Sequence, residues 1–83
     1  MDKNLKEIED KKMRYLHIMV DLTSTVILQS SMSRQKAEEM VETLRKAVLR
    51  MFPGKDKTWE IVYANRFKRI IDEKWREETD NSN

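Results

Sequence analysis

The sequence contains no cysteine, one histidine, one glycine and one proline in 83 residues. Without cysteine there are no disulfides or thiolate metal sites, and one histidine supplies too few ligands for most other zinc sites. A glycine-rich phosphate-binding loop is impossible with a single glycine. Because a chain with so few turn-forming residues reverses direction rarely, we expect a few long elements and an all-α fold.

Long hydrophobic runs are also absent. The most apolar stretch, residues 15–28, contains His17 and Asp21 and is too short to cross a bilayer, so we expect no membrane association. Charged residues follow Met1 directly, which is not the pattern of a signal peptide, and we expect a cytoplasmic protein. A chain of this length supports one hydrophobic core, which predicts a single domain over residues 1–78 and a polar tail over residues 79–83.

The charge is nearly balanced. Charged residues make up 39% of the chain, and 17 basic and 15 acidic side chains give a net charge of +2. The whole excess lies in residues 31–52, which hold five basic and three acidic side chains. So small an excess is weak support for binding to nucleic acid.

Apolar periodicity predicts three helices, over about residues 3–29, 34–52 and 57–78, packed as an antiparallel bundle. The second is the clearest, because Ser33 is a suitable N-cap and Pro53 with Gly54 ends the helix. Its apolar residues fill an arc of about 140°, the width of one core-facing stripe. These residues are Ala37, Met40, Val41, Leu44, Ala47, Val48 and Met51.

The third helix is predicted to begin at a cap formed by Asp56 or Thr58. Its core-facing stripe consists of Trp59, Tyr63, Phe67, Ile70 and Ile71, with Val62 at one edge. Ala64, Trp75 and Ile61 lie off this stripe, where we expect contact with a partner.

The first helix is long and unevenly apolar. Residues 23–28 are β-branched enough for a strand, but a single strand would have no partner in this chain, so we predict a helix. Apolar residues from Tyr15 onward cover about 220° of the helical wheel, roughly twice the arc that a bundle helix buries. They form two parallel seams. One consists of Tyr15, Met19, Leu22 and Val26, and the other of Met13, Leu16, Val20, Thr23 and Ile27.

One seam can pack on the other two helices, and the second needs another partner. Leaving four large apolar side chains in water forfeits on the order of 6–12 kcal/mol, against a net stability of about 5–15 kcal/mol for a domain. We therefore predict self-association into a six-helix dimer, since two-fold dimers are the commonest oligomers. The predicted interface for the dimer or another partner is Leu5, Ile8, Tyr15, Met19, Leu22 and Val26. The alternative is a monomer whose third helix wraps around the first.

Signs of chemistry are weak. Glu38 and Glu42 share a helix face that we expect to be solvated. His17 and Asp21 are four residues apart on the polar side of the first helix, the spacing of a proton-linked switch, but we expect an ordinary surface or half-buried histidine. The glutamate-histidine motif of di-iron bundles is missing, and no serine has a recognisable base near it in sequence. We expect no catalytic activity, no cofactor and no metal.

A basic cluster around the second connection supports an alternative function. The turn at residues 52–55 permits a helix-turn-helix interpretation, in which these cations would contact DNA. The candidate contacts are Arg45, Lys46, Arg50, Lys55, Lys57, Arg66 and Arg69. The sequence thus predicts a small homodimeric protein-interaction module, an adaptor, regulator or accessory subunit with an unknown protein partner. The alternative is a DNA-binding transcriptional regulator that uses the hairpin over residues 45–69.

Overall fold

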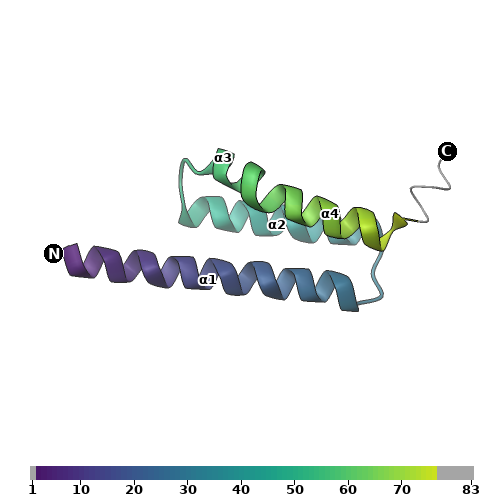
Figure 1. Cartoon of the computed structure of the whole chain (residues 1–83), viewed down its shortest axis with the longest axis horizontal. Helices are drawn as coiled ribbons and strands as arrows, with labels where there is room; N and C mark the ends of the chain where they lie inside the picture. Colours follow the sequence, from purple (N-terminus) through teal and green to yellow (C-terminus); the bar gives the residue numbers. More distant parts are fainter. Residues whose placement is uncertain (1, 77–83) are drawn as a thin grey trace.

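The computed structural model describes residues 2–76, with side chains from Leu5 onward, and this part of the chain is helical without strands. The elements are α1 (Asp2–Gln29), α2 (Arg34–Met51), and a third helical segment made of α3 (Asp56–Thr58), η1 (Trp59–Ala64) and α4 (Asn65–Lys74). α2 runs back along α1, and the third segment runs back along α2 (Figure 1). The prediction of an all-α fold with three helices is confirmed. The predicted end at residue 78 and the tail lie outside the described residues.

Both connections are short and locally determined. The hydroxyl of Ser33 accepts a hydrogen bond of 3.1 Å from the backbone N–H of Lys36, which confirms the predicted N-cap of α2. Residues 52–55 form a turn closed by a 3.2 Å hydrogen bond from the N–H of the last residue to the carbonyl of the first. Pro53 and Gly54 occupy its two central positions, and the φ of +81° at Gly54 is the value that a type II turn requires.

The third segment differs from its prediction at its start and in its register. The cap position is Lys55, which makes no side-chain cap bond, so the predicted caps at Asp56 and Thr58 are wrong. η1 is a π-helix, in which residues five apart bond along the axis. This wider turn brings Ala64 into line with Trp59, so Ala64 packs on the core instead of lying off the stripe.

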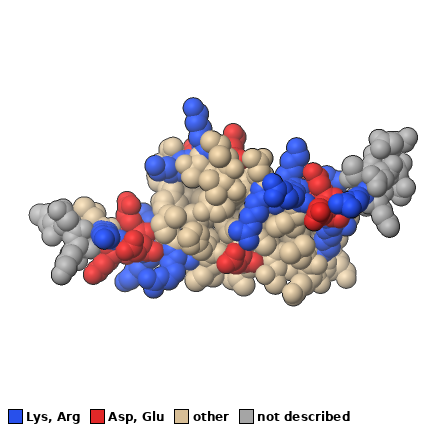
Figure 2. Space-filling view, in the orientation of Figure 1, with Lys and Arg blue, Asp and Glu red and all other residues tan. Residues whose placement is uncertain are grey.

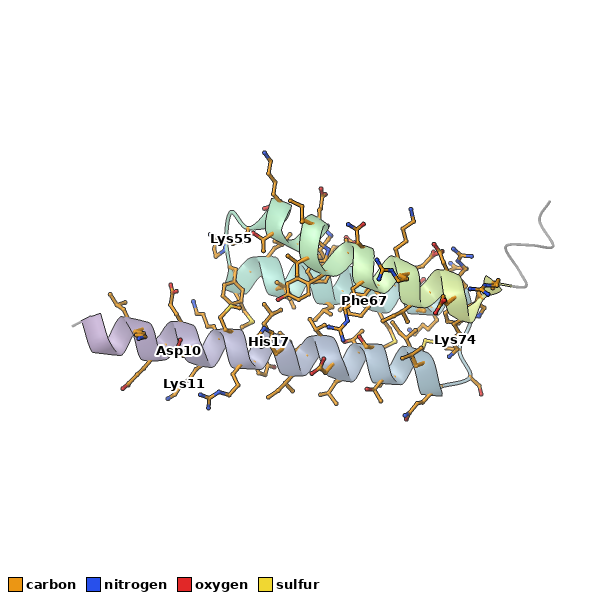
Figure 3. The ribbon with its side chains drawn as sticks, viewed as in Figure 1. Asp10, Lys11, His17, Lys55, Phe67 and Lys74 are labelled. Carbon is orange, nitrogen blue, oxygen red and sulfur yellow. The ribbon has the colours of Figure 1, made fainter. Side chains whose placement is uncertain are left out.

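The core lies where the three helical segments meet. Trp59 and Phe67 are buried with their ring centroids 6.2 Å apart, and Tyr63 lies 5.6 Å from Trp59. Figure 3 shows Phe67 pointing from α4 into the space between the helices. The other buried apolar residues are Leu16, Val20, Ile27, Ala37, Leu44, Val48 and Ile71. The aromatic stripe is therefore structural, while Val62 is exposed and belongs to the surface.

α1 buries one side only. Leu16, Val20 and Ile27 face α2 and α4, so the seam that contains them is the inner one. Ser24 is buried beside them. Its hydroxyl donates a 2.8 Å hydrogen bond to the carbonyl of Val20, which satisfies the buried oxygen within the helix.

Lysines of neighbouring helices bind the carbonyl ends of α1 and α2. α1 has no basic residue in its last turn, and Lys74 of α4 donates to the carbonyls of Ile27 and Ser30, the latter at 2.6 Å. Lys12 of α1 donates to the carbonyl of Met51 at the end of α2, at 3.4 Å. Both contacts place a cation at the negative end of a helix dipole and fix the helices lengthwise.

Candidate interaction surface

The outer side of α1 carries a row of uncovered apolar side chains. Tyr15, Ile18, Leu22 and Val26 are 55%, 50%, 60% and 38% exposed, and we call these four residues the outer stripe. They follow one another at three- and four-residue spacing along the same helix side. Figure 2 shows mostly uncharged atoms over the part of α1 that underlies the hairpin of α2 and α4. Contiguous apolar surface of this kind is typical of a contact site.

The structure places the predicted interface residues on this side. Leu5, Ile8, Tyr15, Leu22 and Val26 are exposed, whereas Met19 is half-buried and packs against the core. The sequence did not single out Ile18, which lies in neither predicted seam. The expectation, made for the alternative monomer, that the third helix wraps around the first does not hold for the described residues, because α2 and α4 both lie on one side of α1 and leave the outer stripe uncovered (Figure 1).

A groove between α1 and α2 lies beside the outer stripe. It has a volume of about 460 Å³ and a largely apolar lining, with Lys36 and Glu39 as its charged residues. Met19, Leu22, Thr23, Met40, Thr43, Leu44 and Ala47 form the rest of the lining. Met40 and Ala47 lie at one edge of the predicted apolar arc of α2. From the sequence, this edge position was the signal that the core does not cover them fully. The groove and the outer stripe share Leu22, so they form one continuous surface.

The start of α1 projects past the hairpin (Figure 1). Every side chain from Leu5 to Lys11 is exposed, and we call residues 5–11 the arm. Within the described chain, the ion pairs and side-chain hydrogen bonds involve no arm residue. The labelled Asp10 and Lys11 lie on this part of α1, beyond the turn that carries Lys55 (Figure 3). The arm therefore has two apolar residues, Leu5 and Ile8, and no described part of its own chain covers them.

The opposite groove, between α2 and the third segment, is rimmed by paired charges. It has a volume of about 390 Å³, with Trp59 and Phe67 among its apolar lining residues. Arg34 binds Glu38 at 3.2 Å and Asp72 at 2.8 Å. Arg34, Glu38 and Asp72 are thus paired, whereas Glu60 and Lys68, which also line the groove, have no ion pair among the described residues.

Glu42, on the same rim, binds Arg45 at 2.6 Å. The hydrogen bond from Arg45 lowers the pKa of the Glu42 carboxyl below its usual value, and the charge of Lys46 acts in the same direction. Glu38 and Glu42 thus bind arginines of their own helix rather than each other or a common ligand. Their arrangement favours two structural ion pairs over a metal or acid–base site.

The basic cluster is partly neutralised. Arg45 binds Glu42, and Asp56 and Glu60 lie near enough to help raise the pKa of its guanidinium further. Arg66 binds Asp21 of α1 at 3.4 Å. Of the seven candidate DNA contacts, those without an ion pair among the described residues are Lys46, Arg50, Lys55, Lys57 and Arg69.

The hairpin also lacks the geometry of a helix-turn-helix. The two helices of that motif cross at about 90–120°, whereas α2 and the third segment lie antiparallel along their length (Figure 1). One expected local pair is replaced as well, because Asp21 binds Arg66 rather than His17. Glu73 binds Arg76 at 3.3 Å.

Metal-binding clusters and membrane-spanning helices are both absent from the described residues. No three histidine, aspartate or glutamate side chains gather closely enough to hold a metal ion among them. No described helix combines the length and apolar character that spanning a bilayer requires. Comparison of the whole chain with protein-family models, curated proteins and solved structures found no match.

Proposed function

We propose that the chain is a small helical protein-interaction module that acts as a homodimer through the outer stripe of α1. The exposure of this stripe is the observation that carries the proposal. The module works by binding, as an adaptor, regulator or accessory subunit for another protein, and the proposal assigns it no catalytic residue.

The energy available from the stripe supports a stable contact. Its four side chains are 38–60% exposed in a single copy, so covering them recovers about half of the 1.5–3 kcal/mol each that full burial gives. For two copies this amounts to roughly 6–12 kcal/mol. Association costs about 4–15 kcal/mol in lost translation and rotation. The stripe therefore offsets much of the cost of dimerisation, and further contacts must supply the rest.

A pair of leucine substitutions tests the proposal. Leu22 on the stripe and Leu28 on the other side of α1 are 60% and 55% exposed, so either can become glutamate without disturbing the core. We expect the wild type and Leu28→Glu to sediment at twice the chain mass of 10.0 kDa, and folded Leu22→Glu at the chain mass itself. Circular dichroism checks that both variants remain helical. A wild type that is monomeric at micromolar concentration contradicts the proposal.

A second candidate function, DNA binding, is supported by Lys46, Arg50, Lys55 and Lys57. These exposed cations lie around the turn between α2 and α3 and have no ion pair among the described residues. Lysine and arginine in such a group can bind phosphates. Against it stand the neutralised Arg45 and Arg66 and the antiparallel hairpin, so we rank this function second.

A further inference from the structure

We infer that the two copies pair with their α1 helices antiparallel, and that the arm of each copy lies in the α1/α2 groove of the other. This inference rests on the proposed function, because it specifies how the dimer is built. It identifies the occupant of the groove as a second copy of this chain.

The exposed face of α1 alone is too small for a standard dimer interface. α1 has 28 residues and is about 42 Å long, and a helix face about 11 Å wide then offers roughly 450 Å². A standard interface buries about 800 Å² on each partner. The groove side of α2, which has 18 residues, adds roughly 300 Å². A stable dimer therefore needs the partner to cover the groove as well as the stripe.

The arm carries apolar residues on the matching side of α1. Ile8 and Met19 are about three turns apart and lie almost in line along the helix. Leu5 is further round the helix toward the inner seam, in the direction of Thr23. Both arm residues thus lie on the side of α1 from which the groove opens. Leu5 and Ile8 would fill part of an apolar groove, and Met19 and Met40 provide flexible walls that adapt to them.

An antiparallel pair brings the arm and the groove together by symmetry. When Leu5 lies opposite Leu22, Ile8 lies opposite Met19, and the two-fold axis passes between Met13 and Arg14. Two-fold symmetry repeats both contacts, since each copy gives an arm and receives one. Each hairpin of α2 and α4 then covers one end of the α1 pair, so the two hairpins do not collide.

A parallel, in-register pair is disfavoured by charge. It would place Lys12, which lies between Ile8 and Tyr15 at three- and four-residue spacing, against the same lysine of the other copy, and like charges at that distance repel. It would also align the two α1 dipoles in the same direction, whereas an antiparallel pair opposes them favourably. Finally, it would leave the arms to pack only on each other.

Cysteine cross-linking distinguishes the arrangements cleanly, because the chain contains no cysteine. Each test is made under mild oxidation, and a disulfide needs Cα atoms about 4.4–6.8 Å apart. Leu22→Cys alone should stay reduced. A mixture of Leu5→Cys and Leu22→Cys proteins should give the mixed disulfide, and Leu28→Cys is the exposed control.

Sedimentation of the same proteins under reducing conditions tests the existence of the dimer separately from its antiparallel geometry. A monomeric mass for the reduced wild type overturns the proposed function and this inference together. A dimeric mass with a Leu22→Cys homodisulfide, or without the mixed disulfide, overturns the antiparallel arrangement and leaves the dimer in place. A dimeric mass with the expected mixed disulfide supports both.

Discussion

The ammonium group of Lys74 lies between the end of α1 and the indole of Trp75. It donates to two carbonyls of the α1 end, and its nitrogen is 5.0 Å from the centre of the Trp75 ring. These contacts bind the carbonyl end of α1, which has no basic residue in its last turn. Trp75 itself packs on the core rather than facing a partner. One half-buried lysine thus joins the first helix to the last.

Replacing this lysine tests its contribution to stability. Lys74→Met keeps the apolar stem but removes the donor, so two carbonyls lose a charged partner. We expect the free energy of unfolding to fall by about 1–2 kcal/mol. Urea unfolding at one protein concentration measures it, since the stability of a dimer depends on concentration. Lys68→Met, an exposed lysine of the same helix, is the control. Equal midpoints for both variants would show that the Lys74 contacts contribute nothing.

The helix α1 has two parts that differ in how they are packed. Its second half is held by the core, whereas the arm is exposed on every side within its own chain. Helices that lack tertiary packing are marginal in water, and their ends fray. If the arm lies in the groove of a second copy, its helical structure depends on association.

Amide hydrogen exchange measures this dependence. We expect the amides of residues 5–11 to be protected in the wild type and in Leu28→Glu, and to exchange rapidly in Leu22→Glu. Protection in the core helices should be alike in the two variants, which confirms that only the arm has changed. Slow exchange of the arm in a monomeric Leu22→Glu protein would show that α1 is stable without the partner.

For the whole molecule, shape and charge together favour protein over DNA as the partner. The fold is elongated, with a radius of gyration of 15.2 Å, and a chain of this length packed as a sphere-like domain has about 12 Å. The net charge is only +2. Acidic and basic atoms lie beside one another over the third segment (Figure 2), so the visible face offers no broad surface of one sign to a phosphate backbone.

A titration with duplex DNA tests this conclusion. We expect no measurable binding at physiological salt, because fewer than half a dozen cations near the turn are unpaired. Fluorescence anisotropy of a labelled duplex, repeated at low salt, provides the measurement. An affinity that falls steeply as salt rises, and that is lost when Lys55 and Lys57 become glutamine, would make DNA binding the leading function.

Local signals in the sequence predicted much of this architecture. The spacing of Leu44 and Val48, the hydroxyl of Ser33 and the Pro53-Gly54 turn each act through neighbours within a few residues, so the sequence could determine them. The width of the apolar arc on α1 likewise followed from the order of residues along one helix.

Other features depended on contacts between distant residues. Three features depend on how the helices lie against one another. They are the choice of the inner seam of α1, the alignment of Ala64 through η1, and the binding of Lys74 to the end of α1. Pairs such as Asp21 and Arg66 are 45 positions apart, and several cations could have reached the same carboxylate. Periodicity determines which side of a helix is apolar, but only the packed tertiary structure decides which apolar side is covered, because that choice depends on the position of the neighbouring helices.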